Sequence, residues 1–203
     1  MKYFIFTVIL TLTLTRGMCG KTNFVLVMTD DQGWGQTGYY NHPVLKTPNL
    51  DEMASNGLRF DQFYAGGPVC SPTRATVLTG RTHDRTGVFD HGYALRKQEK
   101  TLPQALQKVG YSTGHFGKWH LANNMIPDSP LPGEYGYDEY GAFNCAGEQM
   151  PVHEDARNAV QFIEKSHQAS KPFFINLWLH EHHTPFHTVP KYRWRFRDMK
   201  SEE

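Results

Sequence analysis

Apolar and polar residues alternate along the chain in blocks that predict an α/β protein. Two continuous apolar runs, at residues 23–29 and 173–179, suit strands that are buried on both faces, as in a parallel sheet. A mixed run at 111–116 predicts a third strand, and the alternating stretch at 58–64 predicts a fourth. Because helical segments separate these runs, we expect a parallel or mixed sheet with helices on both faces.

Helix signals occupy four segments between the strands. The predicted helices are 48–57, 70–80, 101–110 and 154–167. The first and third have a threonine that can cap the helix at its start and a glycine that can end it. Two stretches without a clear period, 81–100 and 123–151, are predicted to be surface loops.

The first 20 residues have the pattern of a secretory signal peptide. Lys2 precedes a short apolar run, which ends in small residues near Cys19 and Gly20. The run is too short to span a membrane, and a buried N-terminal strand is the alternative interpretation. We therefore expect entry into the secretory pathway with an extracellular or lysosomal destination, and a mature domain at residues 21–203.

Length, charge and cysteine content narrow the function only slightly. A chain of 203 residues is near the size of one domain, and a net charge of +1 gives no electrostatic reason to expect nucleic acid or an anionic membrane as partner. Removal of the signal peptide would leave Cys70 and Cys145. If Cys70 has a chemical role, Cys145 is either a free buried thiol or pairs outside this chain.

The segment around Cys70 predicts a cysteine at the start of a helix. Gly66, Gly67 and Pro68 form a loop that neither helix nor strand continues through, and Pro72 suits a first helical turn. The helix dipole and Arg74, one turn on, would both favour an anionic group at this position. The alternative is a buried structural cysteine beside a surface arginine.

Charged residues follow two of the predicted strands at their carboxyl ends, where open α/β sheets bind their ligands. Asp30 and Asp31 follow the first strand, and adjacent carboxylates favour a hard cation such as Ca²⁺ or Mg²⁺ between or beside them. A solvated turn is the alternative. Lys118 and His120 follow the strand at 111–116 and alternate about one residue, so both side chains can point the same way.

Three histidines follow the last predicted strand: His180, His182 and His183. Such a group suggests metal binding, including zinc, or contact with an anion. The residues alone leave that choice open.

Two strings of the sequence resemble the signatures of the sulfatase family. The first is Cys-Ser-Pro-Thr-Arg followed by Leu-Thr-Gly, at residues 70–80, and the second is Gly-Tyr-Ser-Thr with Gly-Lys-Trp-His, at residues 110–120. Phe116 departs from the second signature, because the family usually has a smaller residue there. The resemblance covers residues 22–190 and implies an alkaline-phosphatase-like α/β/α sandwich with a mostly parallel, incomplete sheet.

The resemblance implies a nucleophile and a metal. A formylglycine-generating enzyme would convert Cys70 to formylglycine, whose aldehyde hydrate attacks the sulfur of a sulfate ester and later expels sulfate. Asp30 and Asp31 would hold one Ca²⁺ that also binds the modified Cys70 and a sulfate oxygen. Arg74 would keep the attacking oxygen ionised.

Substrate and proton-transfer roles are implied in the same way. Lys118 and His183 would bind sulfate oxygens and assist the leaving group, with His180 as their neighbour and as the alternative to His183. His120 would orient the hydrate or accept its proton. The opening string at residues 30–35 resembles the arylsulfatase A and N-acetylgalactosamine-6-sulfatase types, which implies a sulfated sugar or glycosaminoglycan end as substrate.

The chain is much shorter than members of the family, and the same fold allows two alternative functions. Members are usually more than twice this long, with further metal ligands and a second lysine beyond the position of Glu203, so we expect a fragment that is poorly stable and inactive alone. A phosphonate or phosphate ester hydrolase of the same fold is one alternative function. A truncated secreted binding protein that keeps the pocket without turnover is the other.

Overall fold

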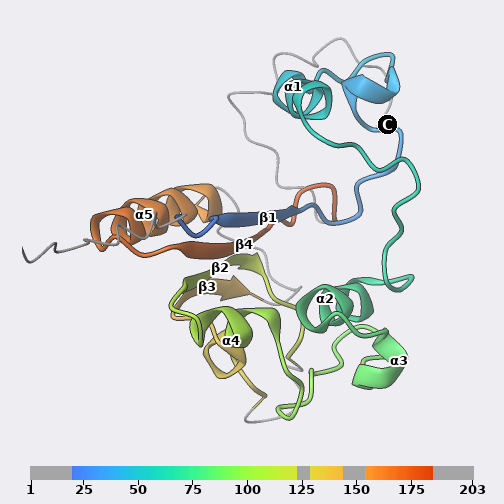
Figure 1. Ribbon diagram of the computed structural model, residues 1–203. Coiled ribbons are helices and arrows are strands. Elements are labelled where there is room, and N and C mark those ends of the chain that lie inside the picture. The colour runs from blue at the N-terminus through green and yellow to red at the C-terminus, as the bar shows by residue number, and fades with distance from the viewer. Residues whose placement is uncertain (1–19, 123–128, 144–153, 185–203) are drawn as a thin grey trace, which may run out of the picture.

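The computed structural model describes residues 20–122, 129–143 and 154–184. The predictions for the signal peptide and for Cys145 fall outside these residues. The described strands form one parallel sheet with the order β1-β4-β2-β3 (Figure 1). They are β1 (Phe24–Met28), β2 (Ser112–Lys118), β3 (Glu139–Phe143) and β4 (Phe173–Trp178). Because all pairs are parallel, the carboxyl ends of the strands meet at one edge of the sheet.

Helices cover both faces of this sheet (Figure 1). They are α1 (Pro48–Asn56), α2 (Cys70–Thr79), α3 (His83–Thr86), α4 (Leu102–Gln107) and α5 (Asp155–Gln168), with 3₁₀ turns η1 (Gly38–Tyr40) and η2 (Pro132–Tyr135). The period of two along β4 explains the layers. Phe173 and Ile175 pack with Phe162 of α5, whereas Phe174 and Trp178 point the other way. The predicted α/β/α sandwich with a parallel sheet is therefore confirmed for the described part of the chain.

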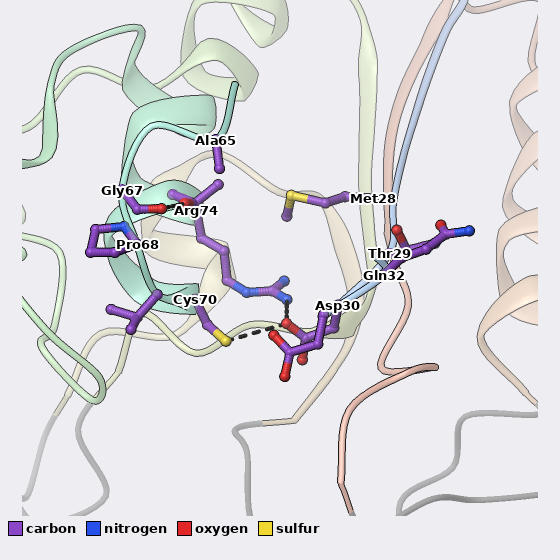
Figure 2. A pocket seen from close by; sticks show the side chains of 12 residues that line it. Met28, Thr29, Asp30, Gln32, Ala65, Gly67, Pro68, Cys70 and Arg74 are labelled. Carbon is purple, nitrogen blue, oxygen red and sulfur yellow. Dashed lines mark hydrogen bonds and ion pairs between the residues drawn. The ribbon is translucent and has the colours of Figure 1, made fainter. Parts of the chain in front are cut away.

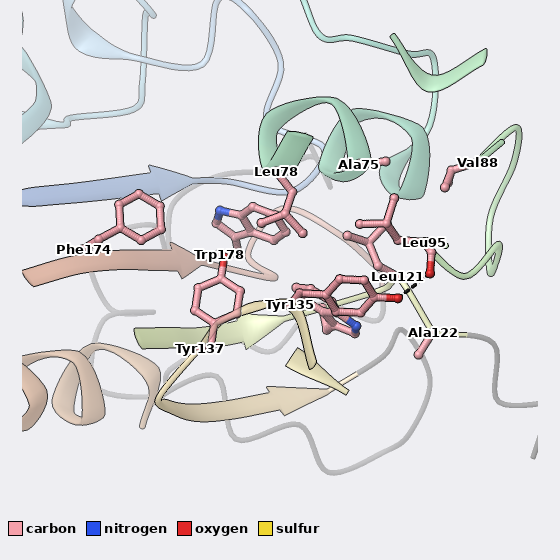
Figure 3. Close-up of a cluster of buried hydrophobic side chains, with 11 residues drawn as sticks. Ala75, Leu78, Val88, Leu95, Leu121, Ala122, Tyr135, Tyr137, Phe174 and Trp178 are labelled. Atoms are coloured by element: carbon pink, nitrogen blue, oxygen red, sulfur yellow. Dashed lines mark hydrogen bonds between the residues drawn. The ribbon is translucent and has the colours of Figure 1, made fainter. Parts of the chain in front are cut away.

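The larger apolar cluster lies between the sheet and α2 (Figure 3). Leu78 of α2 faces Trp178 and Phe174 of β4 there, and Tyr135 and Tyr137 close the cluster from the segment before β3. All five side chains are almost fully buried. This cluster fixes α2 against the strand ends, which sets where the first residue of α2 lies.

Two expectations about strands are wrong. Residues 58–64 alternate in polarity but contain no strand, and Leu58 and Phe63 are 81% and 82% exposed, since no neighbouring strand pairs with them among the described residues. The predicted loop at 123–151 contains β3, which hydrogen-bonds β2 from the edge of the sheet. Five residues that include a central glycine give β3 too weak a pattern to recognise.

The predicted burial is also wrong for β1 and α1. Strand β1 is an edge of the described sheet, and its Val25 and Val27 are exposed, although the apolar run predicted a strand covered on both faces. Helix α1 forms where expected but buries no residue within the described part. The stretch at 81–100 is largely irregular as predicted, apart from the one-turn helix α3. None of the helices in the described ranges has the length and apolar character needed to cross a membrane.

Candidate active site

Helix α2 begins at Cys70, as the glycine and proline pattern predicted. The loop before α2 packs closely against the helix. A Cβ atom on Gly67 would lie 2.6 Å from the Pro72 Cβ, and one on Gly66 would lie 2.6 Å from the Thr76 side chain. The helix ends at Gly80, whose φ of 66° is in the left-handed region and whose N–H donates to the Thr76 carbonyl. The small residues of this loop bring Cys70 into the interior, where it is 9% exposed.

Asp30 is the centre of a buried cluster of charges around Cys70 (Figure 2). Its Oδ1 accepts hydrogen bonds from Cys70 Sγ and from Arg74 Nη2, both at 3.2 Å. Its Oδ2 accepts from Lys118 Nζ, which also lies 3.4 Å from Cys70 Sγ. Three segments distant in the sequence, at the ends of β1 and β2 and at the start of α2, thus meet at one thiol.

The buried charges shift the pKa values of Asp30 and Cys70 in opposite directions. Burial raises the pKa of the Asp30 carboxyl, but the hydrogen bond from Lys118 and the charge of Arg74 outweigh it and hold that pKa below its usual value. Burial also raises the pKa of the Cys70 thiol, and here the nearby Lys118 charge does not compensate. The unmodified thiol is therefore a poor nucleophile at neutral pH, whereas the helix dipole and Arg74 had suggested an anionic group.

Arg74 is held on three sides. Besides the ion pair with Asp30, its Nη1 donates to the Lys118 carbonyl at 2.9 Å, and its guanidinium lies 5.2 Å from the centre of the Trp178 ring. The side chain is almost fully buried. Trp178 was not recognised as part of the site, because an apolar residue inside a strand indicates only core packing.

His183 and Asp31 lie at the open side of the cluster. His183 Nε2 is 3.6 Å from Asp31 Oδ2, and polar atoms of His183, Asp30 and Cys70 lie within 4.8 Å of one another. The His180 ring is buried behind His183, with 4.8 Å between ring centres. The structure therefore brings His183, rather than His180, to Cys70, and the function of both remains a prediction.

His120 follows β2 and lies beside the start of α2. Its carbonyl accepts a hydrogen bond from Ser71 Oγ at 2.6 Å, and its ring lies 5.7 Å from that of His91. Burial, followed by the charges of Lys118 and Arg74, lowers the pKa of His120 to about 4. The ring is therefore neutral near pH 7 and can accept a proton. His91 belongs to the stretch at 81–100 that was predicted to be a surface loop, and only the folded loop brings it to His120.

A cavity of about 260 Å³ opens beside this cluster, between the end of β1 and the start of α2 (Figure 2). Asp30, Asp31 and Cys70 line it together with residues of the glycine loop. The carboxylate oxygens are of the donor type that Ca²⁺ prefers, and they border a space large enough for an ion and a small anion. Ca²⁺ takes about six to eight oxygen ligands, so Asp30 and Asp31 would form only part of its coordination shell.

A fifth histidine, His115, is fully buried behind the site. It lies on β2, with ring centres of Trp119 and Trp178 at 5.1 and 5.0 Å, both edge to face. Burial, helped by the charge of Arg74, lowers the pKa of His115 to about 3. The folded protein therefore keeps this imidazole neutral at any pH at which a cell compartment operates.

We expect His115 to make the fold sensitive to acid. Between pH 6.5 and pH 3 the unfolded chain binds a proton at His115 that the folded chain does not, so stability falls as the pH falls. From pH 7.5 to 5.0 the loss from this residue is about 2 kcal/mol. Urea unfolding of His115→Phe at both values should show that much less pH dependence, while the exposed control His167→Ala should match the wild type. Equal pH dependence in His115→Phe would contradict this explanation.

Comparisons with known proteins agree with this fold. The sulfatase family model matches residues 22–202. N-acetylgalactosamine-6-sulfatase of Canis lupus familiaris is 32% identical over 211 residues, which cover 80% of this chain and 40% of that protein. Arylsulfatase G of the same organism is 43% identical over 133 residues, covering 62% of this chain and 24% of the relative. The solved structure of BT4656 with D-glucosamine-2-N,6-O-disulfate superimposes with a TM-score of 0.76 at 25% identity, covering 90% of this chain and 39% of that one.

The fold and the cluster define a class of α/β proteins with a buried polar cluster at the start of a helix, beside the carboxyl ends of parallel strands. Within that class, the chain belongs to the sulfatase family, whose model matches residues 22–202. It spans about 40% of the length of the first curated relative.

Proposed function

We propose that this chain carries the nucleophile half of a sulfatase site, which hydrolyses sulfate esters of sugars. The observation that carries the proposal is the buried contact of one thiol with a carboxylate and an ammonium group: Cys70 Sγ is 3.2 Å from Asp30 Oδ1 and 3.4 Å from Lys118 Nζ. A structural cysteine gains nothing from such neighbours, and even paired buried charges keep a large desolvation cost, so a cluster of this kind is more typical of a functional site. Membership of the sulfatase family supports the same function.

The modification of Cys70 supplies what the thiol lacks. Its raised pKa leaves the sulfur protonated, and conversion to formylglycine by a maturation enzyme of the secretory pathway would supply a hydrated aldehyde, whose hydroxyl is the nucleophile. A Ca²⁺ held by Asp30 and Asp31, when bound, supplies positive charge beside the reacting sulfate.

The other side chains have separate tasks in this proposal. Arg74 and Lys118 are fixed, buried cations that stabilise negative charge on the nucleophile and on the sulfate oxygens. His120, neutral near pH 7, accepts the proton of the nucleophilic hydroxyl at a ring nitrogen. His183 is at the open side of the cavity, where it can donate to a sulfate oxygen or to the leaving group, with His180 behind it.

The substrate class is proposed from the relatives. The similar proteins include N-acetylgalactosamine-6-sulfatase, and one similar solved structure contains a sulfated glucosamine. We therefore propose a sulfated sugar or glycosaminoglycan end as substrate. The predicted signal peptide makes the secretory pathway, with a lysosomal or extracellular destination, the proposed location.

The test combines mass spectrometry with rate measurements. After co-expression with a formylglycine-generating enzyme, the peptide containing Cys70 should show the mass of the aldehyde. With Ca²⁺ present, a form of the protein that spans the length of its sulfatase relatives should hydrolyse an aryl sulfate faster than the matching aryl phosphate, and a chelator should abolish the difference, whereas the 203-residue chain alone is expected to be inactive. Cys70→Ala should lose on the order of 10³-fold or more in turnover, whereas Val77→Ala, on the same helix but partly exposed, should retain it.

Other outcomes separate the alternatives. Faster hydrolysis of the phosphate ester would assign the site to a phosphate or phosphonate ester hydrolase. An unmodified thiol after co-expression, with sulfated sugar still bound, would assign the chain to a binding function. Conversion of Cys70 without hydrolysis of either ester by the longer form would contradict the proposed activity.

A further inference from the structure

Three side chains with ligand atoms that suit zinc, one thiol and two imidazoles, come together at the start of α2. Cys70 Sγ and ring nitrogens of His91 and His120 lie within 4.8 Å of one another. They come from three segments: the first residue of α2, the loop after α3, and the loop after β2. The two imidazole rings lie 5.7 Å apart with an angle of 30° between their planes, so both flank the same space.

We propose that the unconverted thiol form of this protein binds one Zn²⁺ through Cys70, His91 and His120. Thiolate and imidazole are the ligands that zinc prefers, in contrast to the carboxylate oxygens on the other side of Cys70. Three protein ligands leave a fourth tetrahedral position for water. Ligand atoms around a tetrahedral zinc are roughly 3.5 Å apart, given bonds of about 2.0–2.3 Å, so the site closes by about 1 Å when it binds.

The surroundings of the three ligands permit both the closer approach of the ligand atoms and the loss of the thiol proton. His91 is exposed and belongs to an irregular loop, so its ring can approach without disturbing the core. Binding replaces the Cys70 S–H bond by an S–Zn bond, and the thiol proton passes to solvent. Arg74 and Lys118 repel a cation, but the new thiolate charge offsets them.

A second arrangement of ligands competes for the same sulfur. Asp30, Cys70 and His183 also lie within 4.8 Å of one another. Asp30, however, is already paired with both Lys118 and Arg74, so a metal there would have to displace a buried ion pair. On the side of His91 and His120, a metal leaves that ion pair in place and displaces only the Cys70 S–H hydrogen bond to Asp30, which is why we place zinc there.

The site has a consequence for maturation. Conversion of Cys70 to an aldehyde removes the sulfur, so bound zinc and conversion exclude each other. Zinc at this position would shield the thiol from alkylating reagents and from the maturation enzyme. This inference concerns the precursor thiol and does not depend on the proposed sulfate chemistry.

The experiment uses the full chain expressed without a maturation enzyme and titrated with Co²⁺ as a spectroscopic probe, followed by displacement with Zn²⁺. Wild type should show a sulfur-to-cobalt charge-transfer band and tetrahedral d–d bands, and Cys70→Ser should lose the first. His91→Ala should weaken binding by on the order of 100-fold, since even the partners of metal ligands are worth about 10- to 100-fold. His167→Ala, an exposed histidine of α5, is the matched control and should bind as wild type does.

Two results would overturn the proposal. One is equal affinity in His91→Ala and wild type, which is interpretable because His91 is exposed and its loss should not unfold the chain. The other is loss of the bands in His183→Ala but not in His91→Ala, which would move the metal to the side of Asp30. In support, Zn²⁺ should slow alkylation of the Cys70 peptide at least tenfold without slowing that of the Cys145 peptide, about the protection that 90% occupancy gives.

Discussion

Replacement of Asp30 by asparagine should destabilise the protein by roughly 3–5 kcal/mol, the cost of removing one partner from a buried ion pair. Asparagine keeps the size of the side chain and removes only its charge. Lys118 and Arg74, both at most 2% exposed, would then remain as two buried cations with no carboxylate between them. The free energy of unfolding in urea at neutral pH measures the effect.

Asp31 provides the matched control for this experiment. It is the next residue, but its side chain is 57% exposed and its carboxylate lies 3.6 Å from His183, so Asp31→Asn should cost less than about 1 kcal/mol. In the double variant Asp30→Asn with Lys118→Met, removal of one buried cation that lacks its carboxylate should restore part of the lost stability. Equal stabilities of Asp30→Asn and Asp31→Asn would mean that the buried cluster does not support the fold.

The sequence predicted the parts of the site that depend on local signals. Glycines and prolines determine where α2 begins, so they predict that Cys70 lies at a helix start. Parallel strands bring their carboxyl ends to one edge, so Asp30 and Lys118 could be expected near each other from strand order alone. Which atoms meet could not be predicted, because the contacts join residues 40 to 88 positions apart.

Long-range contacts also explain the errors. Strand β3 exists because β2 offers it hydrogen bonds, whereas residues 58–64 have a better alternating pattern but no partner among the described residues. The fold of its loop brings His91 beside His120, and the position of β4 brings Trp178 beside Arg74. The residues next to each of them in the sequence do not predict these contacts. The choice between His180 and His183 required the positions of both rings.

Close packing within the sheet constrains the backbone at Gly117. Gly117→Ala should lower the free energy of unfolding by about 3 kcal/mol or more. Its φ of 104° is rare for any residue with a side chain, and an added Cβ would lie 2.1 Å from the carbonyl oxygen of Trp178 on the neighbouring strand. That oxygen belongs to the backbone of β4 and cannot move aside alone. The strain would therefore be relieved by displacing the end of β2.

Displacement of β2 would change the surroundings of Cys70 directly, because the residue after Gly117 is Lys118. The Lys118 ammonium contacts Cys70, and the Lys118 carbonyl accepts a hydrogen bond from Arg74. We therefore expect Gly117→Ala to lose both stability in urea and the protection of the Cys70 thiol from alkylation. Gly80→Ala is the control: it has a φ of 66° but no atom within 4 Å of the new Cβ, so it should cost only about 1 kcal/mol and leave Cys70 protected. If the two variants were equally stable, backbone conformation alone would account for Gly117, and close packing against Trp178 would have no part in positioning Lys118.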